Sequence, residues 1–247
     1  HTAKLERGEP HLLLVATDGE LYGHHQPFRD MFLAHLLKNA GPQQGIMPTY
    51  PARWLREYPP RRTIGIREHT SWSCYHGTAR WSADCDCTPT GSPWKANLRT
   101  ALNNVASAID KVYVEALAPY RIDPWELRDN YVHVMLGEQP IEDLLGSATK
   151  QRLSEHEQQR LHALLEAQRE RQRMFTSCGW FFEDFDRIEP KNNVAYAAQA
   201  VHLTRVASNV DLSPMAVEQL RKVVSPRSGL RADQVFSSHL KRAQQHL

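Results

Sequence analysis

The chain has no long hydrophobic run, and this absence excludes a helix that crosses a membrane. Such a helix needs roughly 18 or more consecutive apolar residues, and no segment of the 247 residues comes near that length. The first ten residues are polar and do not resemble the apolar core of a secretion signal. We therefore expect a cytoplasmic protein without a membrane partner.

An excess of charge of one sign is missing as well. The chain has 30 basic and 28 acidic residues, which gives a net charge of +2. Proteins that bind nucleic acid or anionic membranes usually carry a strongly basic surface, so we expect neither partner. The chain has no internal repeat and no low-complexity tract, and its hydrophobic content of 41% is typical of a globular protein with a core.

Cysteine is scarce, and three of the four cysteines fall within fourteen residues. Without a secretion signal, such a cluster favours metal binding or reduced thiols over disulfides. Together with His76, the cysteines offer enough ligands for a structural zinc ion or an iron–sulfur cluster. The candidate metal ligands are Cys74, Cys85, Cys87 and Cys178.

The spacing Cys-x-His-x8-Cys-x-Cys is not that of a standard zinc finger. Buried free thiols that hold a loop are therefore the alternative interpretation. If a metal binds, we expect a structural role, in which Cys178 helps to fix the loop around Trp72 onto the helical part of the chain.

A short apolar run over residues 12–16 ends abruptly in the acidic and glycine-containing segment 17–25. The run is typical of a buried parallel strand. Asp18 and Glu20 would then stand at the carboxyl end of that strand, where α/β folds bind ligands. The alternative is a polar turn after a core strand, with His24 and His25 as ordinary surface residues.

Residues 63–68 predict a second short strand with both isoleucines buried. Glu68 would lie at its carboxyl end, followed by Trp72 and Trp81. Carbohydrate sites often combine carboxylates with flat aromatic rings, on which sugar faces stack. Ordinary core packing of either tryptophan is the alternative.

Most of the remaining chain has helical periodicity. The segment 28–37 predicts a helix that stops at residues 39–42, and a capping-box pattern begins a long helix at Ser154. The apolar segment 175–182 should pack against the first ninety residues. Further helices are expected over 98–116, 124–136 and 194–201, and from Ser213 onwards.

The chain thus divides near residue 95, with β/α-like units before it and helices after it. Two strands alone cannot close a barrel or form a stable parallel sheet. Either these strands pair with an upstream part of the protein, or the helices carry the fold.

Four segments together resemble a known family. The segment 17–25 is similar to the fourth sequence motif of glycoside hydrolase family 57, and residues 70–73 with Gly77 and Trp81 are similar to its fifth motif. With residues 84–87 and 174–182, they resemble a branch in which a family 57 catalytic region is followed by a domain of unknown function. The resemblance covers most of the chain.

The resemblance implies an α/β fold that is mostly helical by residue count. Residues 1–95 would be the last strands of an incomplete (β/α)7 barrel, and residues 96–247 would be a helical bundle packed on that barrel. Members act on α-glucans or oligosaccharides by a retaining mechanism that requires no cofactor. By this likeness Asp18 is the general acid/base.

The substrate subsite would be lined by carboxylate, imidazole and indole side chains from the two motif regions. These residues are Glu20, His24, Glu68, Trp72 and Trp81.

The nucleophile of this family precedes the fourth motif, and only a polar segment precedes residue 12 here. We therefore expect the partner of this chain to be an upstream catalytic half of the same protein, and the isolated chain to be inactive. Two other function classes stay open. One is a non-catalytic glucan-binding or interaction module, and the other is a metal-dependent, deacetylase-type hydrolase that uses Asp18, His24 and His25.

Overall fold

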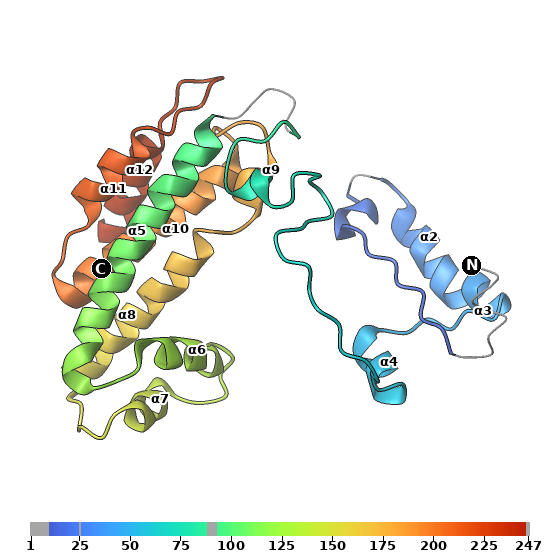
Figure 1. Cartoon of the computed structure of the whole chain (residues 1–247), viewed down its shortest axis with the longest axis horizontal. Coiled ribbons are helices and arrows are strands. Elements are labelled where there is room, and N and C mark those ends of the chain that lie inside the picture. Colours follow the sequence, from blue (N-terminus) through green and yellow to red (C-terminus); the bar gives the residue numbers. More distant parts are fainter. Residues whose placement is uncertain (1–9, 25, 88–92, 246–247) are drawn as a thin grey trace. The chain divides into compact units, whose positions relative to one another are not determined.

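The computed structural model describes residues 10–24, 26–87 and 93–245 (Figure 1). They belong to two compact units, residues 1–66 and residues 67–247. Regular structure in the described residues is helical, apart from one isolated antiparallel bridge between Val224 and Arg231. The fold is therefore mostly helical, and the expected incomplete barrel is not found in this part of the chain.

The first unit contains short helical segments joined by extended chain (Figure 1). A single 3-10 turn, η1, spans Gly19–Leu21. Helix α2 (Arg29–His35) continues through the π-helical η2 (Leu36–Ala40) into α3 (Gly41–Gln43), and α4 spans Pro51–Glu57. The predicted helix over 28–37 is thus confirmed.

The predicted stop of that helix at residues 39–42 is wrong. Helical backbone continues to Gln43, and the chain leaves the helix at Gly45, which has a φ of 74°. Glycine adopts this left-handed conformation without the steric penalty that a Cβ brings. Pro42, which has no N–H, stands at the start of α3, where the π-helical hydrogen-bond pattern of η2 changes to the α-helical pattern.

The two predicted strands are extended segments without a sheet partner in the described residues. Leu13 and Leu14 are 71% and 68% exposed, and Ile64 and Ile66 are 86% and 84% exposed. The expected burial of these side chains is therefore wrong for this unit. The physical reason is that nothing described within the unit covers them: only Gly41 is buried among its described residues.

The second unit is a helical bundle with α10 near its centre, packed against α5, α8 and α12 (Figure 1). Its short 3-10 turns are η3 (Ala79–Trp81) and η4 (Ala118–Tyr120). Its α-helices are α5 (Trp94–Leu117), α6 (Pro124–Met135), α7 (Ile141–Ala148), α8 (Glu155–Arg173), α9 (Cys178–Phe181), α10 (Ile188–Ser208), α11 (Ser213–Leu220) and α12 (Ala232–Gln245).

The apolar stripe predicted over residues 98–116 lies on α5, and its members are buried except Ala116, which is half-buried. They contribute to two core clusters. The first cluster includes Trp94, Trp180 and Phe236 from α5, α9 and α12. The second cluster, which includes Tyr113 and Leu164, joins α5 to α6, α7 and α8. One long helix thus serves both halves of the core.

Helix starts agree with the sequence signals. Ser154 and Glu157 form the predicted capping box: Glu157 N donates to Ser154 Oγ at 3.3 Å, and Ser154 N donates to Glu157 Oε2 at 2.8 Å. The side chain of Asp123 caps α6, which begins at Pro124 as predicted. Such contacts satisfy backbone N–H groups that have no partner inside the helix.

The apolar segment 175–182 packs against α5 and against η3. Trp180 is fully buried, and its Nε1 donates to the carbonyl oxygen of Lys95 at 3.4 Å. The guanidinium of Arg80, which belongs to η3, stands 4.9 Å from the ring centre of Phe181. The predicted packing against the first ninety residues is therefore confirmed for the part around Arg80.

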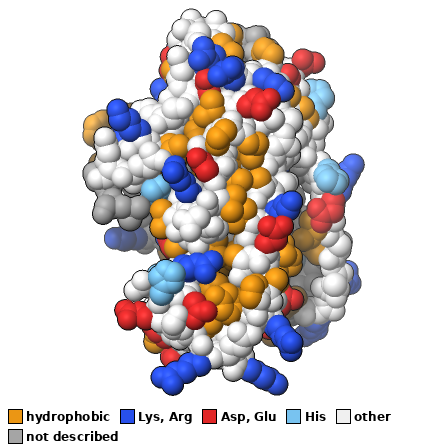
Figure 2. Space-filling model, turned by 90° about the vertical axis from the view of Figure 1, so that its left-hand side faces the viewer, with side chains coloured by type: hydrophobic (Ala, Val, Ile, Leu, Met, Phe, Trp, Pro, Cys, Tyr) orange, Lys and Arg blue, Asp and Glu red, His pale blue; other side chains and the backbone are white. Residues whose placement is uncertain are grey.

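Figure 2 shows one face of the molecule, where hydrophobic side chains alternate with charged ones. Lys, Arg, Asp and Glu side chains are interspersed on this face, so it carries no large area of a single sign.

Candidate metal centre

The segment that carries three of the cysteines begins with a tightly closed loop. Ser71 Oγ donates to the carbonyl oxygen of Gly77 at 2.9 Å, and Thr70 Oγ1 donates to that of Arg67 at 2.8 Å. Gly77 has a φ of 70°, and a Cβ on this residue would overlap the carbonyl oxygen of His69. This loop conformation therefore requires glycine at position 77. The closed loop sets the direction of the chain around Cys74.

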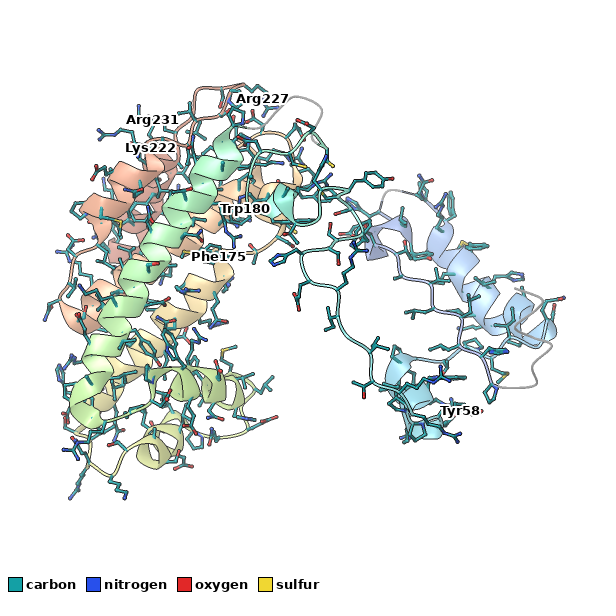
Figure 3. All side chains as sticks on the ribbon, in the orientation of Figure 1. Tyr58, Phe175, Trp180, Lys222, Arg227 and Arg231 are labelled. Carbon is teal, nitrogen blue, oxygen red and sulfur yellow. The ribbon has the colours of Figure 1, made fainter. Side chains whose placement is uncertain are left out.

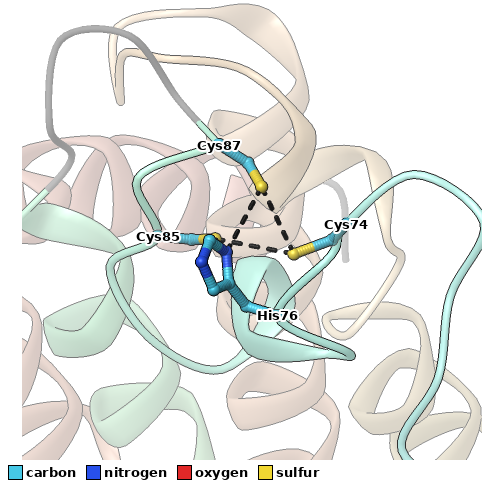
Figure 4. Close-up of side chains that lie close together, drawn as sticks. All are labelled: Cys74, His76, Cys85 and Cys87. Carbon is cyan, nitrogen blue, oxygen red and sulfur yellow. Dashed lines mark hydrogen bonds between the residues drawn. The ribbon is translucent and has the colours of Figure 1, made fainter.

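Four side chains converge at this point (Figure 4). Cys74 Sγ lies 3.5 Å from Cys85 Sγ and 3.6 Å from Cys87 Sγ. His76 directs Nδ1 at the same centre, 3.3 Å from Cys85 Sγ and 3.4 Å from Cys87 Sγ. All four donor atoms lie within 4.8 Å of one another, an arrangement that could hold a metal ion.

These spacings agree with a tetrahedral zinc site. Zinc bonds of about 2.3 Å to sulfur and about 2.0–2.1 Å to nitrogen place neighbouring ligand atoms roughly 3.5–3.8 Å apart. The four measured separations of 3.3–3.6 Å are close to this range.

Backbone amides also point at the sulfur atoms. Burial alone would raise the pKa of the Cys74 thiol, but hydrogen bonds from Cys85, from the backbone of His76 and Arg80, and from Cys87 lower it to about 7. Burial raises the pKa of Cys85, although the backbone of Cys87 donates to it. Two arms, Cys74-x-His76 and Cys85-x-Cys87, therefore share one local pattern: the backbone amide two residues after the first cysteine donates a hydrogen bond to its sulfur. Amide donors stabilise the thiolate form of a cysteine ligand.

The group is fixed to the helical unit by the residues around it. Cys74 and Cys85 are buried, Cys87 is half-buried, and His76 is exposed. Trp81 lies between the two arms in the sequence, packs against the first core cluster, and accepts a 3.0 Å hydrogen bond from Arg99 Nη1 at its carbonyl oxygen. The site thus joins an irregular segment to α5.

A buried positive charge lies near the group, and it was not identified from the sequence. Lys95 is fully buried at the start of α5. Burial and the neighbouring Arg80 lower its pKa to about 8, whereas the charges of Cys85, Asp84 and Glu183 oppose this shift. The only signal for this buried charge in the sequence is that Lys95 stands between Trp94 and Ala96 at the apolar start of the helix.

The structure does not bring the fourth predicted cysteine ligand into the group. Cys178 is an exposed free thiol at the start of α9, and His76 takes the fourth position instead. The short arms Cys74-x-His76 and Cys85-x-Cys87 offered a signal for this arrangement, because two ligands two residues apart converge easily on one ion.

The predicted acid/base motif forms a compact turn in the first unit. Asp18 precedes η1, and its carbonyl oxygen accepts from the amide of Leu21 at 3.3 Å. The amide of His24 donates to the carbonyl oxygen of Glu20 at 3.1 Å, and Gly23 has a φ of 128°. The side chains of Asp18 and Glu20 are exposed. His25, named for the hydrolase alternative, lies outside the described residues.

The other predicted substrate residues belong to the second unit. Glu68 is exposed in the loop before Cys74, and the indole of Trp72 is 86% exposed on the same loop. Trp81 is half-buried, and its buried Nε1 has no hydrogen-bond partner in the part of the chain that the structure describes. The two tryptophans therefore differ: Trp72 offers a free ring face, and Trp81 supports the core.

In the described part of the chain, none of the helices has both the length and the apolar composition of a membrane span.

Comparison with known proteins gives one match. A family model described as a domain of unknown function (DUF3536) matches residues 92–247. No curated protein and no solved structure matches the chain. The matched region begins at the helical bundle and covers more than half of the sequence. The chain therefore belongs to the family defined by this domain of unknown function (DUF3536).

Proposed function

We propose that the chain is the carboxyl-terminal part of a retaining, α-glucan-active glycoside hydrolase or glucanotransferase of the family 57 type. In this proposal Asp18 is the general acid/base, and residues 67–87 form a structural zinc element. The resemblance of the motif at residues 17–25 carries the proposal. The family match adds support, because the resemblance predicts a domain of unknown function after the catalytic region.

The exposed apolar side chains of the first unit support the proposal that an upstream β/α region completes the barrel. The extended segment 12–15 and the isoleucines at 64 and 66 expose apolar side chains that a globular protein normally covers. Phe28, Met31 and Phe32 expose a second apolar surface on α2. Strands and helices of an upstream β/α region would cover both, with 12–16 and 63–68 as the last strands of the sheet.

A retaining mechanism assigns distinct roles to two carboxyl groups roughly 5–5.5 Å apart. Asp18 would protonate the leaving oxygen and then activate water or an acceptor sugar. A glutamate of the upstream half would attack the anomeric carbon.

The loop around Trp72 fits a sugar-stacking role. Its indole is almost fully exposed, while the Ser71–Gly77 hydrogen bond holds the backbone beneath it. A rigid, exposed ring provides a flat apolar face at a low entropic cost, because only two side-chain torsions need to be fixed. Glu68, His24 and Glu20 would supply hydrogen bonds to sugar hydroxyls.

The activity is tested in the protein that contains the upstream region. Asp18→Asn should lower α-glucan turnover by about 10²–10⁴-fold, since positioned acid–base catalysis contributes that much. Asp30→Asn, an exposed carboxylate in the first turn of α2, is the matched control and should retain turnover. Unchanged turnover in Asp18→Asn would refute the assignment.

Two further outcomes separate the other function classes. A chelator should leave turnover intact in the first minutes, whereas a metal-dependent hydrolase would lose it at once. Binding of maltooligosaccharide without any turnover, with or without the upstream region, would indicate a glucan-binding module instead.

A zinc ion bound by the cysteine and histidine group would have a structural role. Cys74, His76, Cys85 and Cys87 would supply four protein ligands and leave no open position for a substrate, as in structural zinc sites. Four donor atoms within 4.8 Å of one another suit a single ion better than a multi-iron cluster. The bound ion would fasten the Trp72 loop to α5. Reduced thiols at this spacing also suit the cytoplasm.

A further inference from the structure

A polar pocket of about 450 Å³ lies on the second unit between helices α5 and α8. Residues from one face of α5 form one wall, and residues at the end of α8 and just after it form the other. This α5–α8 pocket is lined by Arg99, Asn103, Ala106, Ser107, Arg171 and Phe175. None of these residues belongs to the metal group or to the proposed glucan site.

Arg99 is held in this pocket by neutral groups. Its guanidinium stands 4.8 Å from the ring centre of Phe175 and 5.6 Å from that of Trp180, and Nη1 donates to the carbonyl oxygen of Trp81. The two rings are stacked at 6.5 Å, and Figure 3 shows them side by side where α8 ends. In the described part of the chain no carboxylate forms an ion pair with Arg99.

The charge of Arg99 is therefore only partly compensated. Burial lowers the pKa of its guanidinium, which indicates that water stabilises the charge less than usual. Aromatic faces and one carbonyl oxygen attract a cation, but they do not neutralise it. An anion in the pocket would supply the missing partner.

Arg171 approaches the same ring from α8, with its guanidinium 5.7 Å from the centre of Phe175. Its Nε and Nη2 donate to the two carboxylate oxygens of Asp110 at 3.0 and 2.6 Å. This pairing fixes the planar group, and Nη1 has no hydrogen-bond partner among the described residues. Asp110 also accepts from Gln168, so its own charge is already engaged.

The remaining polar groups of the pocket are neutral. The amide of Asn103 lies one helical turn after Arg99 on α5, and the hydroxyl of Ser107 donates to the carbonyl oxygen of Asn103. Two guanidinium groups and one amide thus face a pocket whose lining contains no carboxylate. This set of donors suits a compact oxyanion with several acceptor oxygens.

We propose that the α5–α8 pocket binds a phosphate group, as the free ion or as the phosphate of a small phosphorylated ligand. Arg99 and Arg171 would donate to its oxygens from two sides, and Asn103 would provide a third donor. The ring of Phe175 contacts both guanidinium groups and would hold them in place beside the phosphate. The inference rests on the helical unit alone and is independent of the glycosidase proposal.

The test uses the whole chain and inorganic phosphate as the probe, in calorimetric titration at constant ionic strength. Wild-type protein should bind one phosphate per chain, and Arg99→Gln should weaken binding by about tenfold or more, as expected for loss of a charge-assisted hydrogen bond. Arg128→Gln is the matched control, because Arg128 also stacks on an aromatic ring, at 4.7 Å from Trp125, but lies on α6. It should bind phosphate as the wild type does.

A second variant covers the case in which Arg99→Gln does not fold. Asn103 is exposed, so Asn103→Asp should fold and should abolish phosphate binding by placing a negative charge in the pocket. Comparison of inorganic phosphate with a sugar phosphate distinguishes the free ion from a phosphorylated ligand. Equal phosphate affinity in the wild type, Asn103→Asp and Arg128→Gln, or no saturable binding by the wild type, would overturn the proposal.

Discussion

The thiol sulfur of Cys74 lies 3.5 Å from that of Cys85, eleven positions further along the chain. The intervening residues contain no helix longer than the single turn η3, so regular structure does not enforce this contact. A metal ion bound by both sulfurs, by Cys87 and by His76 would enforce it. The metal would then stabilise the segment in the way that a disulfide stabilises a small extracellular domain.

Loss of one ligand should therefore release the metal and loosen this segment. We predict that Cys85→Ser, purified under reducing conditions, loses its zinc and unfolds at a lower temperature than the wild type. Cys178→Ser is the control, since that thiol is exposed and lies outside the group. It should keep both the zinc and the unfolding temperature. Equal behaviour of the two variants would count against the assignment of ligands.

Asn193 should be a strong determinant of stability. Its buried amide donates to the carbonyl oxygens of Met174 and Thr176 at 2.9 and 3.0 Å, and its Oδ1 accepts from Thr176 Oγ1 at 3.1 Å. Asn193→Ala leaves these groups unsatisfied and should lower the free energy of unfolding by about 1–3 kcal/mol or more. Urea denaturation measures this change.

The matched control for that prediction is Asn104→Ala. The amide of Asn104 is exposed and bonds only to the side chain of Gln219, at 2.9 Å. Its loss should change the free energy of unfolding by no more than about 0.5 kcal/mol. If both substitutions had the same small effect, the buried network around Asn193 would not hold the α8–α9 connection as we infer.

The capping box of α8 gives a smaller, local prediction. Ser154→Ala removes the side-chain acceptor for the amide of Glu157 and should destabilise the protein by about 1 kcal/mol. Ser107→Ala, which removes a hydroxyl bonded back to its own helix, should change stability by less than half of that amount. Thermal unfolding monitored by circular dichroism distinguishes the two.

His202 predicts a dependence of stability on pH. Burial, with a smaller contribution from Arg205, lowers the pKa of its imidazole below 6.5, and its buried Nδ1 has no hydrogen-bond partner among the described residues. The unfolded chain therefore takes up a proton at a higher pH than the folded protein does. Its contribution to stability is complete above about pH 6.5 and is lost as the pH falls through the lowered pKa.

His202→Leu should remove this contribution. The difference in the free energy of unfolding between about pH 7.5 and about pH 5 should be smaller in the variant than in the wild type. His156→Gln, at an exposed position on α8, should leave the difference unchanged. If the difference in His202→Leu equalled that of the wild type, other groups would control the acid sensitivity of the fold.

The helices that could be predicted are those with strong local signals. The apolar stripe of α5 and the capping box of α8 each depend on residues close together in sequence, so local physics determines them. Helix α12 was not predicted because few apolar residues mark it: Phe236 is its main buried side chain. Helix α7 is only eight residues long, which is too short for its apolar residues to show a clear helical periodicity.

The expected strands show where local signals fail. An apolar run at residues 12–16 has the composition of a buried strand, but strand formation depends on a partner that composition does not supply. The prediction of the metal group was incomplete for a different reason. Its members were visible in the sequence, and the short spacing between Cys74 and His76 indicated His76 as a ligand. The position of Cys178 outside the group depends on tertiary packing, which the sequence spacing does not determine.

Cys74, His76, Cys85 and Cys87 should hold a metal ion in the folded protein. The most direct test is elemental analysis of the purified chain, produced without a metal-affinity tag and under reducing conditions. We predict about one zinc per chain and its loss in Cys85→Ser, with retention in Cys178→Ser. Less than about a tenth of an equivalent of any metal per folded wild-type chain would contradict the account.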